Sequence, residues 1–369
     1  MNLEALRMRL SALDRQLVSL IAERQALSRQ VAEVKRSAGR GTRDFKRERD
    51  VIMQAREAAT SLDVSPALVE SVMRLLIRGS LTAQERLRVA AGGRGNGRTA
   101  LVIGGHGKMG RWFSDFLTSQ GYGVTVADPN PEASSNPQAH AYIADWREHS
   151  LDVDLIVVAT PLKIANEVLL ELAQRRPRGT IFDLGSLKTP LRQGIQALQS
   201  AGCQATSVHP MFGPDTELLS GRHVIFIDLG CQAAIDEAQA LFASTMAERI
   251  VMSLDEHDRL IAYVLGLSHA LNIAFFTALA GSGEAAPRLA QLSSTTYDAQ
   301  VEVAGKVAAE SPELYFEIQS LNDYGRESLQ ALRAAVEQLW SAVSTNDAAR
   351  FARLMQRGRE YLAGRVREA

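Results

Sequence analysis

Three glycines and the segments around them form the clearest chemical spacing in the sequence. Gly105, Gly107 and Gly110 follow the pattern Gly-x-Gly-x-x-Gly between the apolar run 101–103 and a helical pattern that starts at Arg111. A strand, a tight turn and a helix N-terminus in this order turn free backbone N–H groups toward a pyrophosphate. The pattern alone is weak, because an ordinary glycine-rich loop can carry it.

An acidic residue follows at the distance that a dinucleotide site needs. A second apolar run, 123–127, ends at Asp128, about 20 residues after the glycines, where an acid can bind the ribose hydroxyls. Pro129 and Asn130 come next, and no arginine that could hold a 2′-phosphate. The sequence therefore predicts an NAD site rather than an NADP site. The remaining expected cofactor-binding residues are Lys108 and Met109 in the loop, and Thr160 and Pro161 after a later strand.

Further apolar runs predict a parallel sheet whose carboxyl ends meet at one edge. Runs at 154–159, 180–184, 205–208 and 223–228 each read as a strand. Their ends are expected to place Thr160, Ser186, Lys188 and His209 around a single cleft. A lone histidine at a strand end is more often structural than catalytic, so His209 needs independent support.

Two cations interrupt the apolar seam of a long predicted helix. Leucines and valines recur every three or four residues from Leu3 to Val34, which predicts about nine helical turns with one apolar face. Arg24 occupies a seam position, and Lys35 returns to nearly the same face three turns later. A guanidinium in a seam is costly unless an anion meets it. Either the two cations bind a dianion, or Arg24 reaches the rim or pairs with Glu23 or Glu48.

Composition and charge describe a chain of several domains. With 369 residues, 46% hydrophobic and 22% charged, it has the composition of a soluble globular protein of two or three domains. Residues 1–91 carry a net charge of +6 and the remainder −7, so the front segment is expected to meet an anionic partner. Two cysteines, Cys203 and Cys231, form no metal motif. We find no signal pattern and no apolar run long enough to span a bilayer, and we expect a cytoplasmic protein.

The predicted organisation has four parts. An all-α module of three helices covers 1–91, and a glycine-rich flexible joint covers 92–98. A Rossmann-type α/β domain follows over 99–252, and an all-α domain over 253–369. Within the last part, Leu254 to Leu279 is apolar almost all round, which is typical of a helix buried in a dimer core.

The front module resembles the all-helical chorismate mutases that are fused to aromatic amino-acid enzymes. The resemblance covers 3–88 and includes the motifs Ser-Ala-Leu-Asp, Arg-Asp-x-x-Arg-Glu-Arg-Asp and Ser-x-x-x-Gln. It implies an intertwined homodimer that bends chorismate into its reactive conformer. The positions that match the family's active site are Arg7, Arg24, Lys35, Asp44, Arg47, Glu48, Ser80 and Gln84.

That resemblance also implies a role for each residue. Arg24, Arg47 and an Arg7 reaching over from the partner subunit would hold the two carboxylates. Lys35 and Gln84 would donate to the ether oxygen, which gains negative charge as the C–O bond breaks. Glu48 would bind the substrate hydroxyl, while Asp44 would orient its neighbours.

Residues 99–320 resemble the prephenate dehydrogenases. The shared motifs are 182–188, the run His-Pro-Met-Phe-Gly-Pro at 209–214, and Glu-His-Asp at 256–258. The resemblance implies that His209 takes the proton of the ring hydroxyl while hydride passes to NAD and carbon dioxide leaves. An imidazole suits this task because it titrates near neutral pH. Ser186 would orient His209 and the substrate.

The second resemblance also covers several other residues and leaves two roles open for some of them. Asp215 matches a position at the cleft mouth, and Lys188 is either a carboxylate contact or a solvated cation. His269 matches a histidine of the substrate pocket, with a packed core histidine as the alternative. Lys306 replaces the arginine that grips the ring carboxylate, and Asp298 replaces another arginine. These two changes leave arogenate open as the second substrate.

Together, the two resemblances imply a bifunctional enzyme of tyrosine biosynthesis that uses NAD. It would rearrange chorismate to prephenate and then convert prephenate to 4-hydroxyphenylpyruvate. One alternative is a dehydrogenase with a non-catalytic helical dimerisation or regulatory module. A basic nucleic-acid-binding head on an NAD sensor is disfavoured, because Arg24 lies in a seam and no recognition-helix pattern is present. We expect neither nucleic acid nor membrane as a partner.

Overall fold

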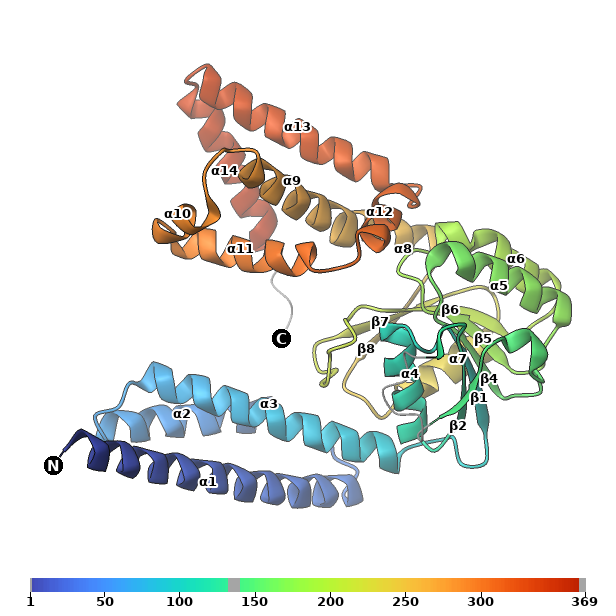
Figure 1. The fold of residues 1–369 in the computed structure, drawn as a ribbon, viewed down its shortest axis with the longest axis horizontal. Helices are drawn as coiled ribbons and strands as arrows, with labels where there is room; N and C mark the ends of the chain where they lie inside the picture. Colours follow the sequence, from blue (N-terminus) through green and yellow to red (C-terminus); the bar gives the residue numbers. More distant parts are fainter. Residues whose placement is uncertain (1, 132–139, 365–369) are drawn as a thin grey trace. The chain divides into compact units, whose positions relative to one another are not determined.

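The computed structural model describes residues 2–131 and 140–364 and divides into two compact units (Figure 1). The first comprises Met1–Thr160, Ile164–Gly185 and Gln193–Met252, and the second comprises Pro161–Lys163, Ser186–Arg192 and Ser253–Ala369. Short segments that follow two strands of the sheet thus belong with the C-terminal helices. Each unit is described by itself.

Three helices open the first unit, at the positions that the sequence predicts (Figure 1). α1 spans Leu3–Ser37, α2 Phe45–Ser61 and α3 Pro66–Ala91. Asp44 caps α2, and Ser65 caps α3 with Pro66 in its first turn. The described residues before 92 contain no strand, so the all-α prediction is confirmed.

The apolar seam of α1 has no cover within the chain. No residue of α1 is buried, and Leu10 and Leu20 are 60% and 61% exposed. α3 packs along α1 but leaves this row of leucines open. A seam this long is stable in water only against another apolar surface.

An eight-stranded sheet follows the three helices in the first unit. The strands are β1 Thr99–Ile103, β2 Gly123–Ala127, β3 Ala141–Ile143, β4 Leu155–Val158, β5 Thr180–Asp183, β6 Ala205–Pro210, β7 His223–Ile227 and β8 Glu248–Met252. Their order is β3-β2-β1-β4-β5-β6-β7-β8, and only the β6–β7 pair is antiparallel. The sequence patterns miss β3 and β8, which are edge strands with exposed residues and little apolar signal.

Helices cover both faces of this sheet. They are α4 Lys108–Ser119, α5 Leu162–Arg175, α6 Arg192–Ser200 and α7 Gln232–Leu241. The 3₁₀ turn η2 spans Trp146–Glu148 in the same unit, and η3 spans Thr189–Leu191 in the second unit. α4 and α7 share a core with alternate strand residues, in which Phe113, Phe182, Phe226 and Phe242 are fully buried. Figure 1 shows α5 and α6 on the opposite face.

The glycine-rich segment after α3 is packed rather than flexible. Gly95 donates its N–H to the carbonyl of Gln120 at 3.0 Å. A Cβ on Gly93 would lie 2.4 Å from that same carbonyl oxygen, and one on Gly95 would lie 2.3 Å from Tyr122. The prediction of a flexible joint is therefore wrong. Gly93 and Gly95 instead allow two backbone segments to pack closely together.

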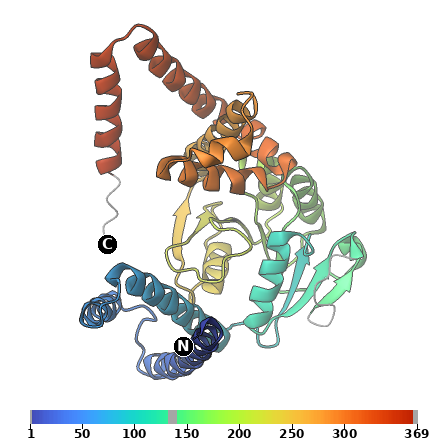
Figure 2. The same ribbon diagram turned by 60° about the vertical axis from the view of Figure 1, so that its left-hand side comes forward.

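The second unit is helical. Its elements are α8 Leu254–Ile261, the π-helix η4 Ala262–Leu267, α9 Ser268–Ala280, α10 Ala286–Gln291, α11 Thr295–Ala308, α12 Pro312–Ser320, α13 Gly325–Ser344 and α14 Ala348–Ala363. Figure 2 shows the sharp turn that joins α13 to α14. α12 and α13 are separated at 321–324, where the Asn322 side chain donates to the carbonyl of Asp258.

One stretch of this unit forms a longer apolar helix than the sequence patterns predict. Leu254–Ala280 is continuous in helical structure, and it is long and apolar enough to cross a membrane by length and composition. This corrects the expectation that no such run exists. Val264 and Leu271 on this stretch are about half exposed in the single chain.

Candidate active sites

Polar side chains of α1 and α3 meet along the line where these helices pack. Arg24 donates from Nη1 to the carbonyl of Leu76 at 2.9 Å and to Ser80 Oγ at 2.6 Å. One turn on, Gln84 donates from Nε2 to Ser28 Oγ at 2.8 Å. Gln84 Oε1 is buried and has no hydrogen-bond partner among the described residues. An orphaned buried oxygen of this kind marks a place for a donor that the chain does not supply.

The electrostatics of Arg24 favour binding an anion. Its two hydrogen-bond partners are neutral oxygens, and burial lowers the pKa of Arg24 from its ordinary value. Glu48 pairs with Arg43 at 3.0 Å, so the alternative of a Glu48–Arg24 pair is wrong. A partly buried guanidinium held by neutral groups keeps its charge for a ligand.

Lys35 lies at the far end of the same line. Its Nζ donates to the carbonyl of Thr42 at 2.8 Å, and Arg88 donates to Thr42 Oγ1 at 3.1 Å. Lys35, Thr42, Gln84 and Arg88 line one small cavity. The structure thus brings together four predicted residues, in two neighbouring groups: Arg24 with Ser80, and Lys35 with Gln84.

The other four predicted mutase residues, Arg7, Asp44, Arg47 and Glu48, do not line this small cavity. Arg7 precedes Arg24 by 17 residues on one straight helix, about 25 Å along its axis. Asp44 caps α2 by accepting the N–H of Arg47 at 2.9 Å, which is a structural role. Glu48 lines a different cavity, beside Arg74 and Arg78. One chain therefore does not gather all eight residues around one cavity.

The glycine loop has the shape that the sequence predicts, with one glycine that the motif count missed. Gly104 has φ +81°, and a Cβ there would lie 2.8 Å from Thr160 N. Gly110 allows helix and strand to pack, since a Cβ would lie 2.3 Å from the Gly104 carbonyl oxygen. Gly107 is the N-cap residue of α4 and supplies no side-chain cap. A helix N-terminus of this kind can receive an anion.

Asp128 is tied to the glycine loop by its carboxylate. Oδ2 accepts the N–H of His106 at 3.1 Å, and Oδ1 accepts that of Asn130 at 3.0 Å. The His106 ring stacks on Tyr142 at a centroid distance of 5.2 Å. Tyr142 in turn donates to the Asp128 carbonyl at 2.9 Å. Sequence spacing missed His106 and Tyr142, because β3 carries almost no strand pattern.

The residues at this edge fit a dinucleotide. β1 lies between β2 and β4, so the carboxyl ends of β1 and β4 form the switch point of the sheet. Thr160 follows β4, and its Oγ1 is buried without a hydrogen-bond partner in the described chain. Lys108 and Met109 open α4, and the Met109 side chain packs on the core. Pro161 follows Thr160 and begins a segment of the second unit.

His209 lies at the end of a central strand. It is 5% exposed, and it faces Ile225 of the antiparallel strand β7. Pro210 ends β6, and the segment 211–222 leads back to β7. His209 belongs to the first unit and Ser186 to the second, so their pairing stays a prediction.

A buried carboxylate organises the segment that carries Ser186. Asp258 is fully buried and accepts the backbone N–H of Lys188 at 2.9 Å and that of Thr189 at 2.6 Å. It also accepts the Thr189 hydroxyl and contacts His257 Nδ1 at 2.6 Å. Burial opposes its ionisation, but the bonds with His257 and Thr189 outweigh burial and lower the pKa of Asp258. Lys188 is fully buried, so the solvated-cation alternative is wrong.

Two predicted substrate contacts lie on the helices of the second unit. His269 of α9 packs against Tyr315 with ring centroids 4.3 Å apart, and burial lowers the pKa of His269. Its Nδ1 is buried and has no hydrogen-bond partner in the described residues. Lys306 of α11 is exposed and pairs with Glu302 at 2.8 Å, while Asp298 lies in the first turn of α11. Both substrate contacts stay predictions.

Comparison with protein families divides the chain into three matches. Residues 6–85 match the type II chorismate mutases. Residues 113–251 match the nucleotide-binding domain of prephenate dehydrogenase, and residues 253–357 match its dimerization domain. These matches follow one another along the chain without overlap.

Curated relatives and solved structures agree with this division. A T-protein of Enterobacter agglomerans is 28% identical over 323 residues, covering 86% of this chain and 81% of the relative. A 4-amino-4-deoxyprephenate dehydrogenase of Streptomyces pristinaespiralis is 28% identical over 69% of this chain and 88% of the relative. The fold is similar to that of prephenate dehydrogenase from A. aeolicus, with a TM-score of 0.55 and 17% identity over 72% of this chain and 98% of that one.

Proposed function

We propose that this chain is a member of the bifunctional family that joins a type II chorismate mutase to a prephenate dehydrogenase, and that it works at two sites in series. It rearranges chorismate to prephenate, and then converts prephenate and NAD to 4-hydroxyphenylpyruvate, carbon dioxide and NADH. Both steps belong to tyrosine biosynthesis. We keep 1–91, 92–98, 99–252 and 253–369 as the proposed domain bounds.

The mutase step needs positioning and charge rather than a nucleophile. Arg24 and Arg47 hold the carboxylates, and Ser80 keeps Arg24 in place through the 2.6 Å bond. Lys35 and Gln84 donate to the ether oxygen as the C–O bond breaks. The observation that carries this proposal is the line of Arg24, Gln84 and Lys35 between α1 and α3, held by neutral partners.

A second copy of the chain completes the mutase in this proposal. Arg7 is too far along α1 to reach the site beside Arg24 of its own chain. The exposed leucine seam of α1 supports a partner helix there. A homodimer also fits the match to a dimerization domain at 253–357. We propose a cytoplasmic homodimer with no nucleic-acid or membrane partner.

The dehydrogenase step relies on groups that orient the substrate and move a proton. When bound, NAD supplies the hydride acceptor. The loop Gly105–Gly110 and Thr160 hold its phosphates, and Asp128 holds the ribose. His209 accepts the proton of the ring hydroxyl, Ser186 orients His209, and His269 and Lys306 bind the substrate. Asp258 keeps the Ser186–Thr189 turn on α8.

Lys306 is expected to contribute to substrate affinity more than to turnover. Lys306→Ala should raise the KM for prephenate about tenfold with a smaller fall in kcat. The reason is that the ion pair between Lys306 and the ring carboxylate of the substrate forms in both ground and transition states. Steady-state kinetics with prephenate measure both constants. Glu302→Ala, which removes only the partner of Lys306, serves as the control. An unchanged KM in Lys306→Ala would mean that another cation binds the ring carboxylate.

The identity of the second substrate is the alternative that this site leaves open. Lys306 stands where the family resemblance places an arginine, and the relative named 4-amino-4-deoxyprephenate dehydrogenase is 28% identical to this chain, over 69% of its length. Comparing kcat/KM for prephenate with that for arogenate distinguishes the two substrates. The proposal predicts a preference for prephenate.

Following chorismate with and without NAD tests the whole proposal. Without NAD, the protein should consume chorismate and accumulate prephenate. With NAD, NADH should appear after prephenate and reach one equivalent per chorismate. NADH formation from prephenate without any loss of chorismate would instead identify a dehydrogenase with a non-catalytic helical module.

A further inference from the structure

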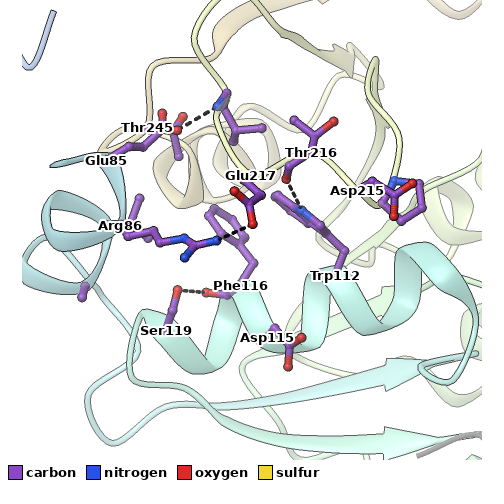
Figure 3. A pocket seen from close by; sticks show the side chains of 14 residues that line it. Glu85, Arg86, Trp112, Asp115, Phe116, Ser119, Asp215, Thr216, Glu217 and Thr245 are labelled. Atoms are coloured by element: carbon purple, nitrogen blue, oxygen red, sulfur yellow. Dashed lines mark hydrogen bonds and ion pairs between the residues drawn. The ribbon is translucent and has the colours of Figure 1, made fainter. Parts of the chain in front are cut away.

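The strand that carries His209 continues into a loop, and the mutase helix α3 holds that loop. Glu85 of α3 is 4% exposed, and its Oε2 accepts the backbone N–H of Leu219 at 2.7 Å. Its Oε1 accepts the backbone N–H of Met246, which lies before β8. Figure 3 shows Arg86 of α3 paired with Glu217 of the loop, and Glu85 beside Thr245 at the edge of the same pocket. One buried carboxylate thus joins three separate parts of the first unit.

The other side of this loop rests on the cofactor helix. Trp112 of α4 donates from Nε1 to the carbonyl of Thr216 at 3.1 Å (Figure 3), and its ring centroid lies 4.9 Å from that of Phe212. Phe212 is three residues after His209. The loop 211–222 is therefore fixed between two supports, Glu85 on α3 and Trp112 on α4.

Adjacent residues of α3 serve two different regions. Gln84 bonds to Ser28 of α1, in the proposed mutase site, and Glu85 bonds to the loop beside His209. Neighbouring residues on a helix point about 100° apart, so one turn of α3 can hold both. Burial raises the pKa of Glu85, against the opposing effect of its two N–H bonds. Burying a carboxyl group costs free energy, and an apolar residue would fill the same space without that cost.

We propose that Glu85 is a positioning residue of the dehydrogenase, through which the mutase helix sets the loop that follows His209. This inference rests on the proposed dehydrogenase function. Glu85 lies in the mutase module but should matter for the other reaction. Nothing in this proposal requires Glu85 to touch either substrate.

Two substitutions at this position test the proposal in the full-length protein. Glu85→Ala should lower the dehydrogenase kcat about tenfold or more, because misplacing a loop by about 1 Å is costly. Mutase kcat and the KM for NAD should stay within about twofold, since Gln84 and the glycine loop are untouched. Glu85→Gln keeps one acceptor oxygen, and it should recover part of the lost dehydrogenase rate.

Controls separate positioning from general damage. Arg86→Ala removes only the exposed ion pair with Glu217 on the same loop, and both activities should stay within about twofold. Trp112→Phe keeps an aromatic ring but removes the hydrogen bond to the carbonyl of Thr216. It should lower the dehydrogenase kcat about threefold. If Glu85→Ala does not fold, Glu85→Gln and Trp112→Phe carry the test.

The ratio of the two activities in one sample decides the outcome. Equal loss of mutase and dehydrogenase kcat would mean that Glu85 only stabilises the fold, and it would overturn the proposal. An unchanged dehydrogenase kcat in Glu85→Ala would also overturn it. Absence of dehydrogenase activity in the unaltered protein would instead refute the proposed function, which is a separate result.

Discussion

Replacing Lys35 with alanine is expected to lower the mutase kcat by about two to three orders of magnitude, the usual cost of losing one transition-state donor. The Nζ of Lys35 lies on the line of polar groups between α1 and α3 and is bonded only to a neutral carbonyl among the described contacts. The charge is thus available when the ether oxygen becomes negative. Chorismate consumption measures the effect, and prephenate oxidation by the same sample should stay within about twofold.

The neighbouring cation provides the control for Lys35. Arg36→Ala removes a charge one residue away; Arg36 also lines the cavity, but it is half exposed and its charge is paired with Glu33. Its mutase kcat should remain within about twofold. If Lys35→Ala and Arg36→Ala had the same small effect, net charge rather than the position of Lys35 would matter, and the assignment would fail.

Replacing His209 with asparagine should lower the dehydrogenase kcat by about two to four orders of magnitude, as expected for loss of a general base. Asparagine keeps a polar group at the end of β6 but cannot take up the hydroxyl proton. NADH formation from prephenate measures this loss. Chorismate should still be converted to prephenate at the normal rate, because no contact of α1 with α3 changes.

A second histidine of the same unit is the matched control for His209. His223 begins β7, is partly exposed and contacts Glu248 at 3.0 Å. His223→Asn should leave the dehydrogenase kcat within about twofold. A His209→Asn enzyme with normal kcat would show that the proton leaves by another route.

Regular local patterns account for what could be predicted from the sequence. The caps Asp44 and Ser65 and the threefold and fourfold steps of leucine specify α1, α2 and α3 without any long-range information. The apolar runs of β1, β4 and β5 are likewise visible because both faces of these strands are buried. The glycine spacing predicts a helix after the loop, and α4 begins at Lys108, three residues before the expected Arg111.

Features that depend on contacts between distant segments could not be predicted. Gly104 is needed because the chain passes close to Thr160, which is 56 residues away. The joint at 92–97 looks flexible by composition, but its glycines lie against Gln120 and Tyr122. The sequence allows Lys188 to be a surface cation, but the residue is buried and Asp258 accepts its backbone N–H.

The two proposed active sites differ in how many of their residues could be predicted from the sequence. Arg24 and Lys35 could be placed on one face of α1 from helical spacing, whereas Ser80 and Gln84 of α3 were linked to them by family resemblance. Arg7 could not, because its proposed site belongs to another copy. His209 and Ser186 were linked by family resemblance, and they lie in separate compact units.

Mixing the two single variants tests most directly the claim that one chain carries two separate sites. Lys35→Ala and His209→Asn are each supplied with chorismate and NAD, alone and together, and NADH is followed. Neither variant alone should form NADH at more than a few per cent of the normal rate, and the mixture should restore it through released prephenate. Normal NADH formation from chorismate by either variant alone would contradict the account.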